Sequence, residues 1–88
     1  MKILTERPPI GTRIAFHTTS KTTKERVLLT GTVIRHHRNH SMCIELDHES
    51  WPHWVIQRED HTTNLGFHLQ RFYEAPPTQT IRELIETT

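Results

Sequence analysis

The run RVLLTGTVIRHH, residues 26–37, constrains the fold more than any other segment. It is rich in β-branched and aliphatic side chains, which is typical of a β-strand. Gly31 stands in its middle, and a glycine inside a strand marks a bend or a β-bulge. Strands of small barrels bend in this way where they curve from one sheet to the other. The segment therefore predicts a long, bent strand of a small barrel.

Four other segments have the character of strands. Residues 12–17, TRIAFH, alternate polar and apolar side chains after the breaker RPPIG, and residues 41–47, SMCIELD, do the same. HWVIQ, residues 53–57, predicts a fourth strand after the turn HESWP, and GFHLQRFY, residues 66–73, predicts a fifth. The polar stretch 18–25 has no helical period and predicts a mobile loop.

Alternation also assigns the faces of these strands, because successive side chains of a strand point to opposite sides of a sheet. Met42 is expected to point inward, whereas Ala15 and Cys43 are expected to point outward. The expected core consists of Ile14, Phe16, Leu29, Val33, Ile44, Leu46, Trp54 and Ile56.

The length of the chain limits it to one domain. Its 88 residues suffice for a single small core and are too few for two ordinary domains. The predicted fold is therefore mainly β, a small antiparallel barrel of about five strands over residues 10–74. A hydrophobic fraction of 33% indicates modest stability, since a domain of this size buries only about 60% of its unfolded surface.

The last residues change period from strand to helix. Ile81, Leu84 and Ile85 follow the spacing of one helix face, and Thr80 with Glu83 has the spacing of a capping box. We expect a short terminal helix over residues 78–87. Two turns are not stable alone in water, so its apolar stripe must dock on the barrel or on another molecule.

The succession IGTRIAF, LTGTVI, CIELD and HWVIQ, within about residues 10–58, resembles the SH3-like small-barrel superfamily, which includes KOW-type and Tudor-type domains. A glycine-led first strand and a Gly-x-Val second strand recur in that superfamily. Its members bind RNA, DNA, ribosomal proteins, peptides or modified side chains. The resemblance thus implies an SH3-like barrel that serves as a binding module, without naming the ligand.

Enzymatic functions find little support in the sequence. Cys43 is the one cysteine and lies between the apolar residues Met42 and Ile44, which is typical of a packed strand residue rather than a nucleophile. The carboxylates Glu45, Asp47 and Glu49 are most simply a solvated acidic edge. Three scattered glycines cannot form a phosphate-cradling loop. We therefore expect no enzyme and no cofactor.

The histidines of this chain suggest a metal-binding site as a more specific alternative. The possible ligands are His36, His37, His40, Asp47, His48 and His53. His36 and His37 would point to opposite faces of a strand, however, and could not chelate one ion together. We expect no physiological metal site.

The segment RHHRNH, residues 35–40, favours nucleic-acid binding. Residues 1–40 contain eight Lys and Arg against two Glu, whereas residues 41–88 contain three Arg against eight Asp and Glu. Arginine forks match phosphate oxygens, and an exposed aromatic ring can stack on an unpaired base. The expected contact residues for RNA, DNA or a nucleoprotein complex are Lys21, Lys24, Arg35, His36, His37, Arg38, His40 and Trp51. The loop that carries Lys21 and Lys24 is expected to lie beside the basic hairpin.

The near-neutral net charge of +1 keeps a second class open, a protein-interaction module. Such a module would be an accessory subunit or a mobile-element inhibitor of a host complex, with a sheet edge, the acidic turn and the terminal helix as its contact surface. The oligomeric state, monomer or dimer, stays open. A single cysteine and the absence of a long apolar run favour a cytoplasmic protein without membrane contact.

Overall fold

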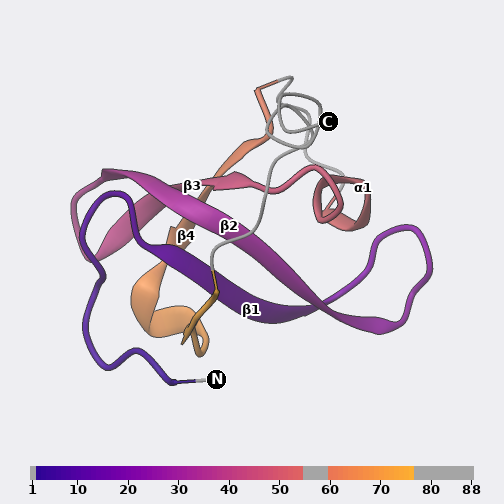
Figure 1. Ribbon diagram of the computed structural model, residues 1–88, viewed down its shortest axis with the longest axis horizontal. Coiled ribbons are helices and arrows are strands. Elements are labelled where there is room, and N and C mark those ends of the chain that lie inside the picture. Colours follow the sequence, from indigo (N-terminus) through magenta and orange to yellow (C-terminus); the bar gives the residue numbers. More distant parts are fainter. Residues whose placement is uncertain (1, 55–59, 77–88) are drawn as a thin grey trace, which may run out of the picture.

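Five antiparallel strands in one sheet make up most of the computed structural model, which describes residues 2–54 and 60–76 (Figure 1). The strands lie in the order β4-β3-β2-β1-β5. Their bounds are β1 Arg13–Thr19, β2 Arg26–His36, β3 Ser41–Leu46, β4 Thr62–Gly66 and β5 Tyr73–Glu74. A one-turn helix, α1 (Trp51–Trp54), follows β3, and a 3₁₀ helix, η1 (Phe67–Leu69), follows β4. The predicted mainly β fold with about five strands is confirmed.

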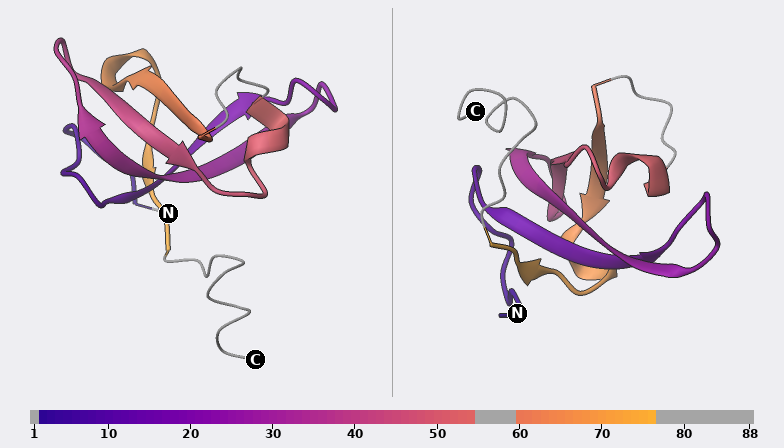
Figure 2. Two further views of the ribbon diagram at one scale, coloured as in Figure 1. Left: turned by 90° about the horizontal axis from the view of Figure 1, so that it is seen from above. Right: turned by 45° about the vertical axis from the view of Figure 1, so that its right-hand side comes forward.

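The sheet is curved, and η1 connects its two outer strands (Figure 2). The N-terminal segment runs along the outer edge of β5, where Ile3 forms a bridge with Tyr73 and the Glu74 amide donates to the Lys2 carbonyl. No helix in the described part of the chain has the length and apolar character needed to cross a membrane.

β2 is long and irregular, as its sequence predicted. It pairs with both β1 and β3, and its register with β3 shifts between Val33 and Arg35. Gly31 is needed because β3 passes very close to it: an added Cβ would lie 2.6 Å from the Glu45 carbonyl oxygen and 2.7 Å from Ile44 Cγ2. The glycine therefore permits close strand packing, while the irregularity itself falls two to four residues later.

The core largely matches the expectation. Six of the eight predicted core residues are at most 2% exposed, namely Ile14, Phe16, Leu29, Val33, Ile44 and Leu46. Met42 is buried among them, and Trp54 packs edge-on against Phe16 while remaining half-buried. Ile56 lies outside the described residues. Two further core residues, Phe67 and Phe72, lie outside the five strands of the structure and were not in the expected core. Their rings stack with centroids 5.7 Å apart.

The expected exposure was wrong at two small residues. Ala15 and Cys43 were expected on the outer face, yet both are fully buried. Ala15 lies between its register partners Thr30 and Tyr73, and Cys43 lies between Arg35 and Asn64. Short side chains flanked by longer ones lose contact with water even on the outer face of a sheet.

The predicted fourth strand was wrong for the part that is described. His53 and Trp54 belong to α1, the remaining residues of HWVIQ lie outside the described part, and β4 is formed by TTNLG instead. The Asp47 carbonyl accepts hydrogen bonds from the amides of Ser50 and Trp51, which turns the chain into the helix. Pro52 fits there because a first-turn position needs no amide donor.

The predicted fifth strand was too long. Residues 67–69 form η1, and only Tyr73–Glu74 pairs with β1 as β5. The predicted terminal helix over residues 78–87, with its capping box, lies outside the described residues.

Candidate nucleic-acid interface

The segment RHHRNH forms the end of β2 and the hairpin turn into β3. Asn39 and His40 have φ angles of 58° and 63°, and the Ser41 amide donates to the Arg38 carbonyl at 3.2 Å. Two positive φ angles inside such a turn define the tight type I′ geometry, which asparagine and histidine tolerate better than most residues. All six residues are exposed. Their side chains therefore project from one end of the sheet.

The N-terminal segment braces this hairpin. Arg7 Nη1 donates to the carbonyl oxygens of His37 and Ser41, at 2.6 and 3.0 Å. His36 Nε2 lies 2.7 Å from the Pro8 carbonyl oxygen, which can only accept, so this nitrogen carries the proton. Arg7 thus adds a third guanidinium at this end of the molecule. Because its contacts span 30 residues or more, no local pattern indicated it.

The other hairpin histidines have partners from β4 and η1. His37 Nε2 lies 3.1 Å from Asn64 Oδ1, and the His40 ring faces the His68 ring with centroids 4.4 Å apart. His36 and His37 contact different partners, as expected for neighbours on a strand. Among the described residues, no three His, Cys, Asp or Glu side chains converge as a metal site would require.

Lys21 and Lys24 lie at the opposite end of β2, so the expectation that they lie beside Arg35 and Arg38 was wrong (Figure 1). Consecutive hairpins lie at opposite ends of the strand they share. β2 is 11 residues long, and a strand advances about 3.3 Å per residue. The basic residues therefore form two separate groups rather than one surface.

The turn that carries the two lysines makes several hydrogen bonds. Ser20 is fully buried, and its hydroxyl accepts hydrogen bonds from the amides of Thr22 and Thr23. The same oxygen lies 2.8 Å from His53 Nδ1, and the Lys21 amide donates to the His53 carbonyl at 2.8 Å. These contacts hold the β1–β2 turn against α1.

Trp51 is less available for base stacking than expected. It lies in α1, is half-buried, and its ring stacks on His61 with centroids 4.6 Å apart and an interplanar angle of 24°. It lies away from the hairpin, because β3 leads from the hairpin to α1.

The expected solvated acidic edge is wrong for Asp47. Its two oxygens accept from Arg13 Nη1 at 2.6 Å and Nη2 at 2.5 Å, and the Thr30 hydroxyl donates to the same carboxylate. The hydrogen bonding of the Arg13 guanidinium to the Asp47 carboxylate, outweighing burial, raises the pKa of Arg13 above its ordinary value. This ion pair withdraws one acidic charge from the surface and ties the end of β3 to β1.

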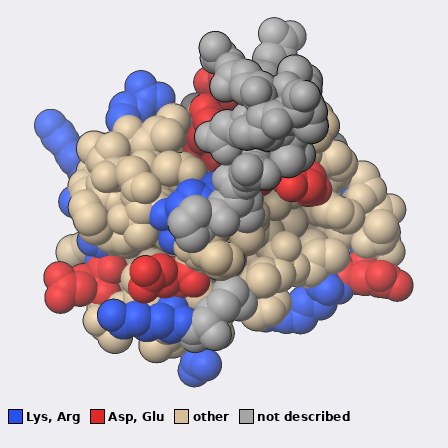
Figure 3. Space-filling view, in the orientation of Figure 1, with Lys and Arg blue, Asp and Glu red and all other residues tan. Residues whose placement is uncertain are grey.

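The charge distribution follows this arrangement. In Figure 3, Lys and Arg side chains project at the upper left, over the end of the sheet where β2 turns into β3, and acidic side chains lie lower on the same side. Sequence explains part of this: no Asp or Glu occurs between Glu25 and Glu45. We call the group Arg7, Arg35, His36, His37, Arg38, His40 and His68 the hairpin surface.

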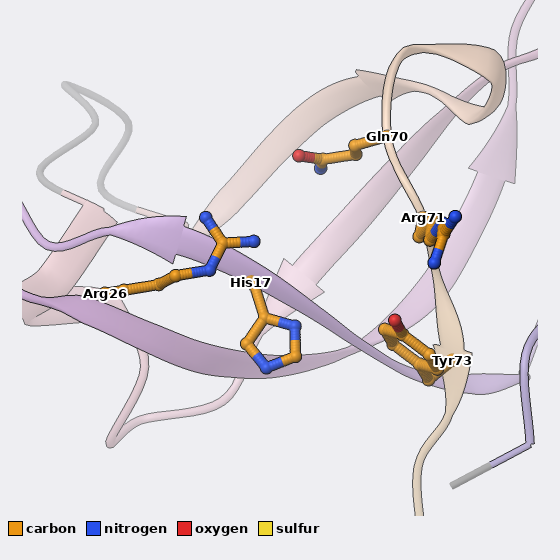
Figure 4. A pocket seen from close by; sticks show the side chains of 5 residues that line it. All are labelled: His17, Arg26, Gln70, Arg71 and Tyr73. Atoms are coloured by element: carbon orange, nitrogen blue, oxygen red, sulfur yellow. The ribbon is translucent and has the colours of Figure 1, made fainter.

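The structure also contains a cavity with basic side chains that no sequence pattern predicted. His17, Arg26, Gln70, Arg71 and Tyr73 line a cavity of about 450 Å³ beside β1 (Figure 4). These residues come from three separate stretches of the chain, and none forms a recognisable motif with another.

Comparison of the chain with protein-family models, with curated proteins and with solved structures gave no match. The residues of this chain are therefore the basis for assigning its function.

Proposed function

We propose that the protein is a non-enzymatic binding module that contacts nucleic acid, or a nucleoprotein complex, through the hairpin surface. One observation carries the proposal: two arginines and three histidines occupy five of six consecutive exposed positions on the hairpin, and Arg7 and His68 join them from other segments. Side chains held on a rigid scaffold at the end of a sheet can contact a large ligand without rearrangement.

The residue types suit phosphate and unpaired bases. Guanidinium groups bind phosphate oxygens in pairs, and planar rings such as those of His40 and His68 provide stacking surfaces. Single strands and loops expose their bases for such contacts. Lys21, Lys24 and Trp51 are not part of this surface, so the proposed contact is smaller than the sequence predicted.

A non-enzymatic role agrees with the surroundings of the one cysteine. Cys43 is fully buried, with its sulfur 4.0 Å from an Arg35 side-chain nitrogen, and a buried thiol is a poor nucleophile for an external substrate. We also propose that the curved five-stranded sheet is an SH3-like small barrel, and that the protein acts in the cytoplasm. Binding modules are common uses of small barrels, which supports the same class of function.

The test is a binding titration with RNA and DNA oligomers at two salt concentrations and two pH values. Affinity should fall with salt, because phosphate binding releases condensed counterions. It should rise between about pH 7.5 and about pH 5.5, since histidine is the side chain type that gains charge in this range.

Zinc and chelator provide the control. A metal site would show the opposite pH dependence, because ligand histidines must be neutral. A circular dichroism spectrum at each pH excludes acid unfolding. Binding that is insensitive to both salt and pH would contradict the proposed contact.

A protein-interaction module is the second candidate, and the position of β4 favours it. β4 is an outer strand of the sheet, and outer strands accept an extended peptide by main-chain hydrogen bonding. This candidate predicts no oligonucleotide binding at any salt concentration, together with a partner whose binding protects the β4 amides from hydrogen exchange.

A further inference from the structure

The cavity beside β1 arises from the shortness of β5. β5 pairs with β1 only at Ile14 and Ala15, whereas β1 continues to Thr19. The chain before β5 turns inward, where Phe72 is fully buried against Phe16. A gap of about 450 Å³ is left between the far half of β1 and the residues that precede β5.

The register places three of the lining side chains on one face of the sheet. Tyr73 pairs with Ala15, Arg26 pairs with Thr19, and Ala15, His17 and Thr19 alternate along the same face of β1. His17 and Tyr73 contact each other edge-on, with ring centroids 5.9 Å apart. Gln70 and Arg71 complete the cavity from the opposite side (Figure 4).

The lining is cationic and rich in donors. It contains two guanidinium groups and no carboxylate, and within residues 2–54 and 60–76 neither the Arg26 nor the Arg71 side chain forms a hydrogen bond or an ion pair. The Gln70 amide, the Tyr73 hydroxyl and a His17 ring nitrogen can all donate as well. Two like charges that share a cavity repel each other, and a bound anion would remove this repulsion.

We propose that this cavity binds a phosphate monoester. Two arginine forks match a phosphate dianion in charge and in donor geometry. The cavity is larger than one phosphate group requires and falls within the usual range for small-molecule sites, so it has room for the organic part of the ligand beside Tyr73. This site contains no residue of the hairpin surface and does not rest on the proposed function.

The experiment compares three ligands: inorganic phosphate, a nucleoside 5′-monophosphate and the corresponding nucleoside. Binding is followed by calorimetry and by the ring NMR signals of His17 and Tyr73. Both measurements can be made on the unaltered protein. We expect saturable binding of inorganic phosphate and of the nucleotide. We expect the bare nucleoside to change neither ring signal. Tighter binding of the nucleotide than of phosphate would support a monoester as the ligand, and equal binding would overturn the monoester in favour of free phosphate.

The variant Arg26→Gln with Arg71→Gln should weaken binding at least about tenfold, because both forks are lost. Lys21→Gln with Lys24→Gln removes the same charge from the β1–β2 turn, outside both the cavity lining and the hairpin surface, and should leave binding unchanged. All four residues are exposed, so the variants should fold. Equal weakening in both double variants, unchanged ring signals with phosphate, or binding of the nucleoside alone would overturn the proposal.

Discussion

At the scale of single residues, two glycines of this chain have different roles. Gly31 faces the backbone of β3, where an added methyl group would lie 2.6 Å from a carbonyl oxygen. At Gly66 the nearest atoms belong to the side chain of Leu69, which is exposed and can move aside. Gly31→Ala should therefore lower the free energy of unfolding by about 3 kcal/mol, and Gly66→Ala by less than about 1 kcal/mol, in urea denaturation. Equal costs would show that β3 does not approach β2 as closely as described.

The ion pair of Arg13 and Asp47 gives a second prediction at this scale. Asp47→Asn should lower the free energy of unfolding by about 2 to 3 kcal/mol, because it leaves a half-buried guanidinium without its charged acceptor. The raised pKa of Arg13 adds stability that is complete at every pH below the ordinary pKa of arginine and is lost only above it, so this contribution stays constant from pH 5 to 9. Glu45→Gln, at an exposed carboxylate of β3, is the control and should cost little. A similar loss in both variants would contradict the role of the pair.

At the scale of elements, the contact between the β1–β2 turn and α1 depends on Ser20. Ser20→Ala removes the acceptor of two turn amides and the partner of His53 Nδ1, and should cost about 1 to 2 kcal/mol. Hydrogen exchange should quicken at Lys24, whose amide donates to the Ser20 carbonyl in the same turn. Thr19→Ala, at the neighbouring exposed position, should change neither quantity. Unaltered exchange at Lys24 after Ser20→Ala would mean that the backbone alone holds the turn.

The elements also show how far the sequence predicts this fold. β1, β2 and β3 were predicted because alternation and β-branched residues are local signals. β4 was missed because TTNLG contains a single aliphatic residue, Leu65, and α1 was missed because it is one turn long and starts from bonds to the Asp47 carbonyl. The hairpin surface was predicted in part for the same reason: residues 35–40 are contiguous, whereas Arg7 and His68 join them only through tertiary contacts.

At the scale of the whole molecule, the decisive feature is that the basic residues occupy both ends of β2. The sequence already indicates this separation, since Lys24 precedes a single long strand and Arg35 lies near its other end, so the two residues cannot share a surface. The separation makes a matched pair of variants possible. Arg35→Glu with Arg38→Glu, and Lys21→Glu with Lys24→Glu, change the net charge of the protein equally. Any difference between them therefore reports the position of the contact rather than the total charge.

We expect the arginine reversal to weaken oligonucleotide binding at least about tenfold and to flatten its salt dependence, because fewer phosphate contacts release fewer counterions. The lysine reversal should act only through long-range repulsion, which is largely screened beyond about 8 Å at physiological salt. Both variants should keep the melting temperature within a few degrees, since exposed charges contribute little to stability. Equal losses in the two variants at physiological salt would place the contact elsewhere. Unchanged binding in both would leave the β4 edge as the better candidate for the contact surface.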